Sequence, residues 1–282
     1  MWNNYGFVRL TEQDFIQQKI EGLNMGNYSE VSKEGRLTII TINRPEVMNA
    51  LHPPGNIELS EAFDSFVLDP DQWVAIITGA GDKAFCAGND LKFQASGGDM
   101  KVQPSTGFGG ITSRFDNPKP VIAAVNGVAM GGGFEIALAC DLIIASENAV
   151  FSLPEPRVGL AALGGGIHRL PREIGSKKAM GMLLTGRRVS AKEGMDLGFV
   201  NEVSREKSAL EAAKDWARSI LECAPLSVRA SKEASMLGMN TSGIEEAIKS
   251  RYKHVELMKK SSDFVEGPRA FSEKRAPIWK GV

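Results

Sequence analysis

The chain has 282 residues, with 33 lysines and arginines against 34 aspartates and glutamates, so its formal net charge is −1. This balance lacks the basic excess that drives non-specific binding to nucleic acid, and we predict no nucleic-acid partner. The 43% of hydrophobic residues and 24% of charged residues are typical of a globular protein. No apolar run approaches the ~18 residues of a transmembrane helix, so we expect no membrane partner.

The N-terminal residues are polar and include Glu12, Asp14 and Glu21. Secretory signals need an apolar stretch and transit peptides avoid acidic residues, so neither fits. The three cysteines lack close spacing and are typical of reduced thiols, which favours a cytoplasmic protein. No cysteine–histidine ligand set is present, so no metal site is predicted.

Glycine is in excess: the chain has 30, whereas average usage would give about 20. The excess lies in the middle of the chain, since 21 of the 30 fall between Gly79 and Gly198. Glycine permits unusual backbone angles and close backbone approach. We therefore expect the functional residues in this central region.

The first half of the chain alternates predicted strands and helices. Helical spacing of apolar residues predicts helices at Asn56–Phe66 and Phe134–Ala139, and Pro53-Pro54-Gly55 reads as a loop. Short apolar or β-branched runs predict strands at residues 37–43, 73–78, 121–125 and 142–145. This order indicates parallel βαβ units and an α/β fold.

From Ser176 onward the pattern is mostly helical. Ser190 and Glu193 form a capping box that opens a short helix. Charged and apolar faces predict further helices at residues 208–221, 225–237, 244–258 and 263–274. We divide the chain into an N-terminal extension over residues 1–27, an α/β core over 28–204 and a helical C-terminal region over 205–282.

A glycine pattern at Gly79-Ala80-Gly81 imitates a dinucleotide-binding fingerprint, because it follows a buried strand. The fingerprint requires a helix directly after the glycines and a second strand ending in an acid. Here turn residues follow, and no apolar strand is expected before Gly110. A tight turn after a strand is the better interpretation.

Three glycines, Gly131–Gly133, precede the predicted helix that carries Glu135. The first N–H groups of a helix have no intrahelical partner and attract an anion or a developing oxyanion. The alternative is that the glycines serve close strand–helix packing and that Glu135 only favours the helix N-terminus. This stretch alone does not decide between the two.

Two weaker signals accompany the triple glycine. Glu155 stands between two prolines, which hold its backbone rigidly and offer few local partners. Partial burial would raise its pKa and suit it to proton transfer, although a surface loop acid is the simpler reading. The turn Ala87–Lys92 offers amide donors and a lysine for a phosphate or carboxylate.

Taken together, these segments resemble the crotonase (enoyl-CoA hydratase/isomerase) superfamily over about residues 30–281. The markers follow the order of the family. They are Asn43-Arg44-Pro45 with Asn49-Ala50-Leu51, Phe85–Leu91, Pro120–Gly127 leading into Gly131–Glu135, Cys140-Asp141, Pro154-Glu155 with Gly159, and Glu266-Gly267 with Ala270-Phe271. The resemblance implies a spiral of ββα units, a helical C-terminal trimerisation region, and a homotrimer or dimer of trimers.

The resemblance also implies roles for named residues. The superfamily holds the thioester oxygen of an acyl-CoA with two backbone amides, which correspond here to Asn89 and Gly132. The hydratase branch uses two glutamates, and both are present as Glu135 and Glu155. Retention of the pair favours hydration of an enoyl-CoA over the isomerase, decarboxylase and dehalogenase chemistries. Coenzyme A is part of this substrate, so no cofactor is expected.

Departures from the family pattern concern substrate binding. A lysine that often follows Arg-Pro is Glu46 here. We therefore assign CoA and substrate contacts to Ala87, Asp90, Leu91 and Lys92 of the turn, and to Lys274. The segment Phe108–Arg114 and the chain ending resemble the carnitinyl-CoA dehydratase branch, which is the alternative reading.

Overall fold

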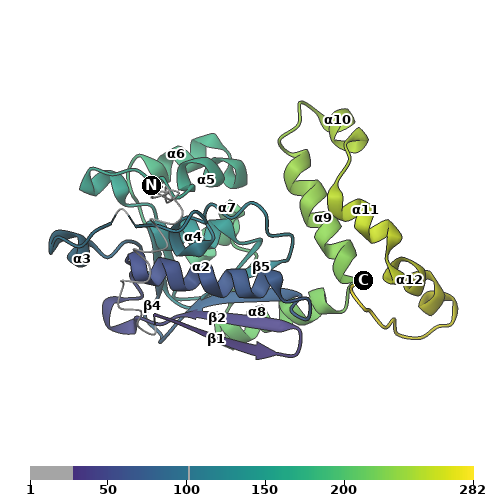
Figure 1. The fold of residues 1–282 in the computed structure, drawn as a ribbon. Helices are drawn as coiled ribbons and strands as arrows, with labels where there is room; N and C mark the ends of the chain where they lie inside the picture. Colours follow the sequence, from purple (N-terminus) through teal and green to yellow (C-terminus); the bar gives the residue numbers. More distant parts are fainter. Residues whose placement is uncertain (1–27, 101) are drawn as a thin grey trace, which may run out of the picture.

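The computed structural model describes residues 28–100 and 102–282, so the predicted extension over residues 1–27 lies outside the described residues. Figure 1 shows a chain in two parts: a body of strands and helices that runs as far as α8, and a group of helices, α9 to α12, that stands beside it. No helix within the described ranges has the length and apolar character needed to cross a membrane.

The larger sheet has six strands in the order β1-β2-β3-β5-β7-β10. They span Ser29–Glu34, Leu37–Ile42, Val74–Gly79, Val121–Val125, Leu142–Ser146 and Glu202–Ser204. Every neighbouring pair is parallel except β1 and β2. The predicted parallel βαβ arrangement is therefore confirmed. Strand β1 was not predicted, because five of its six residues are exposed and no apolar alternation marks it.

The two faces of this sheet are covered by different helices, α2 (Pro53–Leu68) and α8 (Ala209–Leu221). Ile40, Ile77 and Ala123 point into the larger core cluster, which includes the aromatic residues of α2. Their neighbours in sequence point into a second cluster with the alanines of α8. Alternate strand residues face opposite sides of a sheet, so burial of both faces explains why these strands read as continuous apolar runs.

The prediction of a loop at Pro53-Pro54-Gly55 was wrong, because α2 begins at Pro53. Proline is well suited to the first turn of a helix, where its missing N–H would have no partner in any case. The helix is buried along this first turn, so the prolines also contribute to the core.

A second, four-stranded sheet has the order β4-β6-β8-β9. Its strands span Ala84–Cys86, Val128–Met130, Val150–Ser152 and Val189–Ser190. The expectation of no strand before Gly110 was thus wrong: β4 is a fully buried strand, and its three residues are too few to show a periodic pattern.

Four helices connect the two sheets or pack beside them: α4 (Gly132–Ala139), α5 (Gly166–Ile174), α6 (Ser176–Leu183) and α7 (Ala191–Leu197). The helix predicted over Phe134–Ala139 is confirmed and starts two residues earlier. At α7, the Ser190 hydroxyl accepts from Glu193 N–H at 3.2 Å. The Glu193 carboxylate instead pairs with Arg187 at 2.7 Å, so the capping box is only half formed.

The C-terminal helices are α9 (Pro225–Gly238), α10 (Ile244–Lys249), α11 (Lys253–Lys260) and α12 (Ser262–Ser272). The single helix predicted over residues 244–258 is therefore wrong. The chain is extended at Ser250, and the Tyr252 hydroxyl donates to the carbonyl of Ala247 at 2.7 Å. A side chain thus satisfies a carbonyl of the last turn of α10, which allows the helix to end there.

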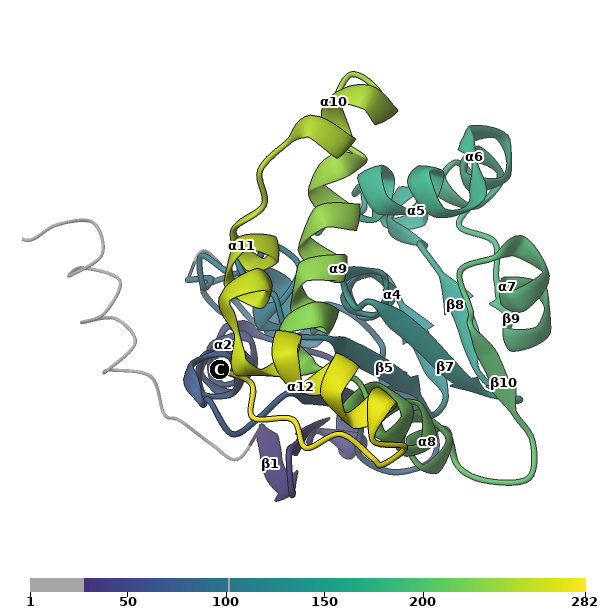
Figure 2. The same cartoon turned by 90° about the vertical axis from the view of Figure 1, so that its right-hand side faces the viewer.

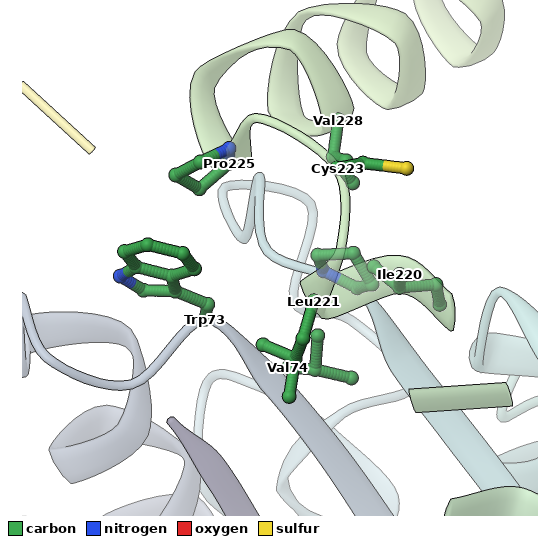
Figure 3. A pocket seen from close by; sticks show the side chains of 8 residues that line it. Trp73, Val74, Ile220, Leu221, Cys223, Pro225 and Val228 are labelled. Atoms are coloured by element: carbon green, nitrogen blue, oxygen red, sulfur yellow. The ribbon is translucent and has the colours of Figure 1, made fainter. Parts of the chain in front are cut away.

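Helix α8 packs on the large sheet, although the sequence division assigns residues after 204 to the C-terminal region. The part that stands beside the body begins with α9 (Figure 1), and Figure 2 views the molecule from that side, with α9 to α12 in front of the sheet. Figure 3 shows the junction, where Trp73 and Val74 of the core face Leu221, Cys223 and Pro225 across a small apolar hollow. The contact also includes polar bonds, because Lys232 of α9 pairs with Asp141 at 2.7 Å and donates to Lys119 O at 2.9 Å.

Candidate active site

The turn Ala87–Asp90 leaves the end of β4 and packs against residues beside α2. Leu51 N–H donates to Gly88 O and Asp90 N–H donates to Leu51 O, both at 2.8 Å. The N–H of Asn89 lies between these bonds, and among the described residues it has no protein acceptor. The turn depends on Gly88, whose φ of +93° is disfavoured for other residues.

The triple glycine lies directly against this turn. A Cβ on Gly88 would be 2.7 Å from the carbonyl oxygen of Met130 and 3.2 Å from the nitrogen of Gly132. Gly131 has φ of +52°, and α4 starts at Gly132, whose N–H therefore has no intrahelical acceptor. The structure thus brings the two predicted amide donors, Asn89 and Gly132, to adjacent backbone segments.

Asp90, predicted to contact CoA, is buried and already engaged. Its carboxylate accepts from Phe93 N–H at 3.0 Å and caps the short helix α3 (Leu91–Ala95). It also forms a buried ion pair with Arg44 at 3.0 Å. Burial raises the pKa of Asp90, but the Phe93 N–H and then Arg44 outweigh burial and hold this pKa below its usual range. Asp90 therefore anchors the turn to the segment that carries Arg44.

The remaining predicted binding residues lie in two places. Ala87 is half-buried in the turn, and Leu91 and Lys92 are exposed on α3. Lys274 follows α12, and Figure 1 shows α3 and α12 at opposite ends of the molecule. Within one chain the structure does not bring Lys274 to Lys92.

Glu135 is buried in the first turn of α4. Its Oε1 accepts from Gly166 N–H, at the start of α5, at 2.8 Å. A Cβ on Gly164 would lie 2.6 Å from its other oxygen, Oε2. The glycines at 164–166 thus allow the backbone to close around the carboxylate.

Glu155 opens the 3₁₀ turn η3 (Glu155–Val158), directly after Pro154. Its side chain reaches back to the triple glycine: a Cβ on Gly131 would lie 3.0 Å from Oε1. The other oxygen, Oε2, is buried and has no hydrogen-bond partner among the described residues. A buried carboxylate oxygen without a partner costs free energy, so this atom suits a water molecule or a substrate.

The pKa values of both glutamates are raised. Burial raises the pKa of Glu135 to about 7, the negative charge of Glu155 adds to the rise, and the Gly166 N–H and Arg169 oppose it. Burial likewise raises the pKa of Glu155. Because the charge of Glu155 disfavours ionisation of Glu135, the pKa of Glu135 depends on whether Glu155 is ionised. Glu135 can therefore bind or release a proton near neutral pH.

Comparisons with known proteins identify the family of this chain. A family model described as enoyl-CoA hydratase/isomerase matches residues 32–282. The chain belongs to the enoyl-CoA hydratase/isomerase family. It is 43% identical over 265 residues to a carnitinyl-CoA dehydratase from Salmonella typhi, a match that covers 91% of this chain and 100% of that protein.

Solved structures of the family confirm the predicted crotonase fold. An enoyl-CoA hydratase from Mycobacterium tuberculosis H37Rv has a TM-score of 0.85 and 38% identity, covering 91% of this chain and 100% of that one. A carnitinyl-CoA hydratase from Mycobacterium avium has a TM-score of 0.72 and 40% identity, with the same coverage. The chain is thus a crotonase-family enzyme.

Sequence reasoning missed two arginines at this site. Arg44 was noted as part of a motif but was given no role, and Arg169 was not singled out. Arg44 pairs with Asp90, and Arg169 donates to Thr112 O and Gly164 O. Their partners are distant in sequence, so no local pattern indicated them.

The raised pKa of Glu135 predicts a specific pH dependence of stability. The folded protein keeps this proton up to about pH 7, whereas the unfolded chain releases it near its ordinary value of 4.5. The stabilisation from the proton is therefore fully present below pH 4.5 and is lost as the pH rises to about 7. Relative to Glu135→Gln, the wild type should lose on the order of 3 kcal/mol of unfolding free energy across this window.

Urea unfolding of both proteins at several pH values between 4.5 and 8 measures this difference. Subtracting the variant removes the contributions of groups that titrate in both proteins. A difference that stays constant with pH would contradict the raised pKa.

Proposed function

We propose that this enzyme is an enoyl-CoA hydratase, which adds water reversibly across the 2,3-double bond of a 2-enoyl-CoA thioester. The observation that carries the proposal is the juxtaposition of buried Glu135 and half-buried Glu155 with two backbone amides that lack an acceptor among the described residues. Glu155 Oε1 lies against Gly131, and Glu135 stands in the first turn of α4, which begins at Gly132.

In this proposal the N–H groups of Asn89 and Gly132 bind the thioester oxygen. Attack of water on carbon 3 moves electrons toward that oxygen, so its negative charge grows in the transition state. Backbone donors that are already oriented stabilise this charge without reorganisation, and loss of one such donor typically costs ~3 kcal/mol. The oxygen replaces the acceptor that both N–H groups lack within the described residues.

The two glutamates carry out the proton transfers, with one carboxyl group ionised and the other protonated. The ionised carboxylate takes a proton from water as its hydroxyl group bonds to carbon 3. The protonated carboxylic acid gives its proton to carbon 2, so the pair ends with the same number of protons. This chemistry is acid–base catalysis and charge stabilisation, and it uses no cofactor beyond the CoA moiety of the substrate.

Substitution of either glutamate tests this proposal. We expect Glu135→Gln and Glu155→Gln each to lower the hydration rate of crotonyl-CoA by about 10²- to 10⁴-fold, because an amide cannot exchange the proton. Butyryl-CoA has no double bond to hydrate and measures thioester binding, which should survive in both variants. Glu147→Gln, on an exposed residue after β7, is the matched control. Turnover like that of the wild type in either site variant would refute the assignment.

A second candidate function is dehydration of a carnitinyl-CoA-like substrate, in which the acyl group carries a quaternary ammonium. The 43% identity to a carnitinyl-CoA dehydratase favours it. The same glutamate pair and amides would serve both reactions, since dehydration is the reverse of hydration.

A panel of acyl-CoA thioesters separates the two functions. For the hydratase, kcat/KM for crotonyl-CoA should exceed that for crotonobetainyl-CoA, because the apolar substrate loses less solvation on entering a buried site. Turnover of crotonobetainyl-CoA with crotonyl-CoA untouched would instead establish the second function.

We further propose that the enzyme assembles as a homotrimer or a dimer of trimers. The C-terminal helices expose large apolar residues, among them Ile244 and Ile248 of α10 and Phe271 of α12, which are 77%, 76% and 87% exposed. Extended apolar surfaces of this kind mark protein interfaces. A neighbouring copy would also allow its Lys274 to reach a CoA that is bound at the turn of this chain.

Light scattering of the purified enzyme tests the assembly. The mass should be three or six times the 30.5 kDa of one chain, and Ile248→Glu should reduce it, since a charge buried at an interface is unfavourable. A monomeric wild type would contradict the assembly. An unchanged mass in a folded Ile248→Glu variant would contradict the role of α10.

A further inference from the structure

Arg169 occupies an unusual position in the first turn of α5. Its guanidinium donates to the carbonyl of Thr112 at 2.9 Å and to that of Gly164 at 3.3 Å. The side chain is half-buried, and no ion pair joins it to a carboxylate among residues 28–100 and 102–282. A partly desolvated cation held by two carbonyls retains positive charge that can act on its surroundings.

One of the two carbonyl partners, that of Gly164, belongs to the backbone that closes around Glu135. Gly164 contacts the Glu135 carboxylate, and two residues later Gly166 N–H donates to it. By binding Gly164 O, Arg169 holds this short segment against the start of α5. Displacement of the segment would remove the hydrogen bond to Oε1 of Glu135.

The other carbonyl partner, that of Thr112, belongs to a second segment, which packs against α4. Thr112 follows the 3₁₀ turn η2 (Phe108–Gly110). A Cβ on Gly132 would lie 2.5 Å from the Phe108 ring, and Gly109 packs against Ile136 of α4. Arg169 therefore links the segment at Gly164 to the segment at Thr112, which is 57 residues away from Arg169 in the sequence.

We propose that Arg169 is a positioning residue for the Glu135 carboxylate: its fork joins these two segments, and its unpaired charge favours the ionised acid. The proposal rests on the hydratase function proposed above, because it concerns the same carboxylate. Arg169 itself need not touch the substrate.

The groups that face these two side chains support an effect of charge. Glu135 faces Glu155 of η3, which raises its pKa, and Arg169 of α5, which lowers it. Burial lowers the pKa of Arg169, and Cys140, Glu135 and Glu173, in that order of effect, oppose this lowering. Burial raises the pKa of the Cys140 thiol, so that group is neutral, and Glu173 is exposed to solvent. Glu135 is thus the buried charge that Arg169 influences most directly.

Two substitutions separate the charge of Arg169 from its fork. Arg169→Met removes both, whereas Arg169→Lys keeps a cation but cannot hold two carbonyls in the planar geometry of a guanidinium. Arg172, which is exposed on the same helix and donates to His168 O at 2.7 Å, provides the matched control Arg172→Met.

The first measurement is the titration of Glu135 by infrared spectroscopy, which needs no turnover. Each protein carries Glu155→Gln, and subtraction of its Glu135→Gln counterpart isolates the carboxyl band. We expect Arg169→Met to raise the midpoint, because the positive charge of Arg169 lowers the pKa of Glu135. Arg169→Lys and Arg172→Met should stay near the reference midpoint. An unchanged midpoint in Arg169→Met would overturn the charge effect.

The second measurement is crotonyl-CoA hydration with Glu155 intact. Both Arg169 variants should lose about 10- to 100-fold in kcat, as expected for a misplaced catalytic group, with little change in KM. Arg172→Met should match the wild type. If Arg169→Met fails to fold, Arg169→Lys decides, and wild-type kcat in that variant would overturn the positioning role. A wild type without hydration activity would refute the proposed function, while the infrared titration would still test the contact.

Discussion

The candidate active site depends on direct contact between two backbone segments. The end of β4 and the start of α4 touch with no side chain between them: a Cβ on Gly133 would overlap the carbonyl of Cys86, and one on Gly88 would press on that of Met130. Packing at this distance requires glycine. It brings the N–H groups of Asn89 and Gly132 to neighbouring positions on rigid elements, so their arrangement does not rely on flexible side chains.

Around this contact, the protein balances opposing effects on a buried acid. Burial is the largest cause of the raised pKa of Glu135, and the charge of Glu155 acts in the same direction. The Gly166 N–H and the Arg169 cation act in the opposite direction. The result is a carboxylic acid with a pKa of about 7, near the pH at which proton donation and acceptance are both efficient. The glycines at 164–166 make this balance structurally feasible.

Local sequence signals predicted those features that depend on local chemistry. The strands at Val121–Val125 and Leu142–Ser146 are continuous apolar runs, and Glu135 and Glu155 stand beside glycines and prolines that mark unusual backbone. The resemblance to a family then gave these residues roles. Interactions between distant residues could not be predicted: the partner of Arg44 is Asp90, and Arg169 binds a carbonyl 57 residues away. The exposed charged strand β1 and the brief β4 carried too little pattern to recognise.

The junction between the core and α9 to α12 has a consequence for labelling. The chain has three cysteines; burial raises the pKa of Cys86 to about 12 and raises that of Cys140, so neither forms the reactive thiolate readily. Cys223 is exposed and stands at the junction, just before Pro225 (Figure 3). The native sequence therefore offers one attachment point for a fluorophore, located where the C-terminal helices meet the sheet, and its emission can report their relative movement without any engineered cysteine.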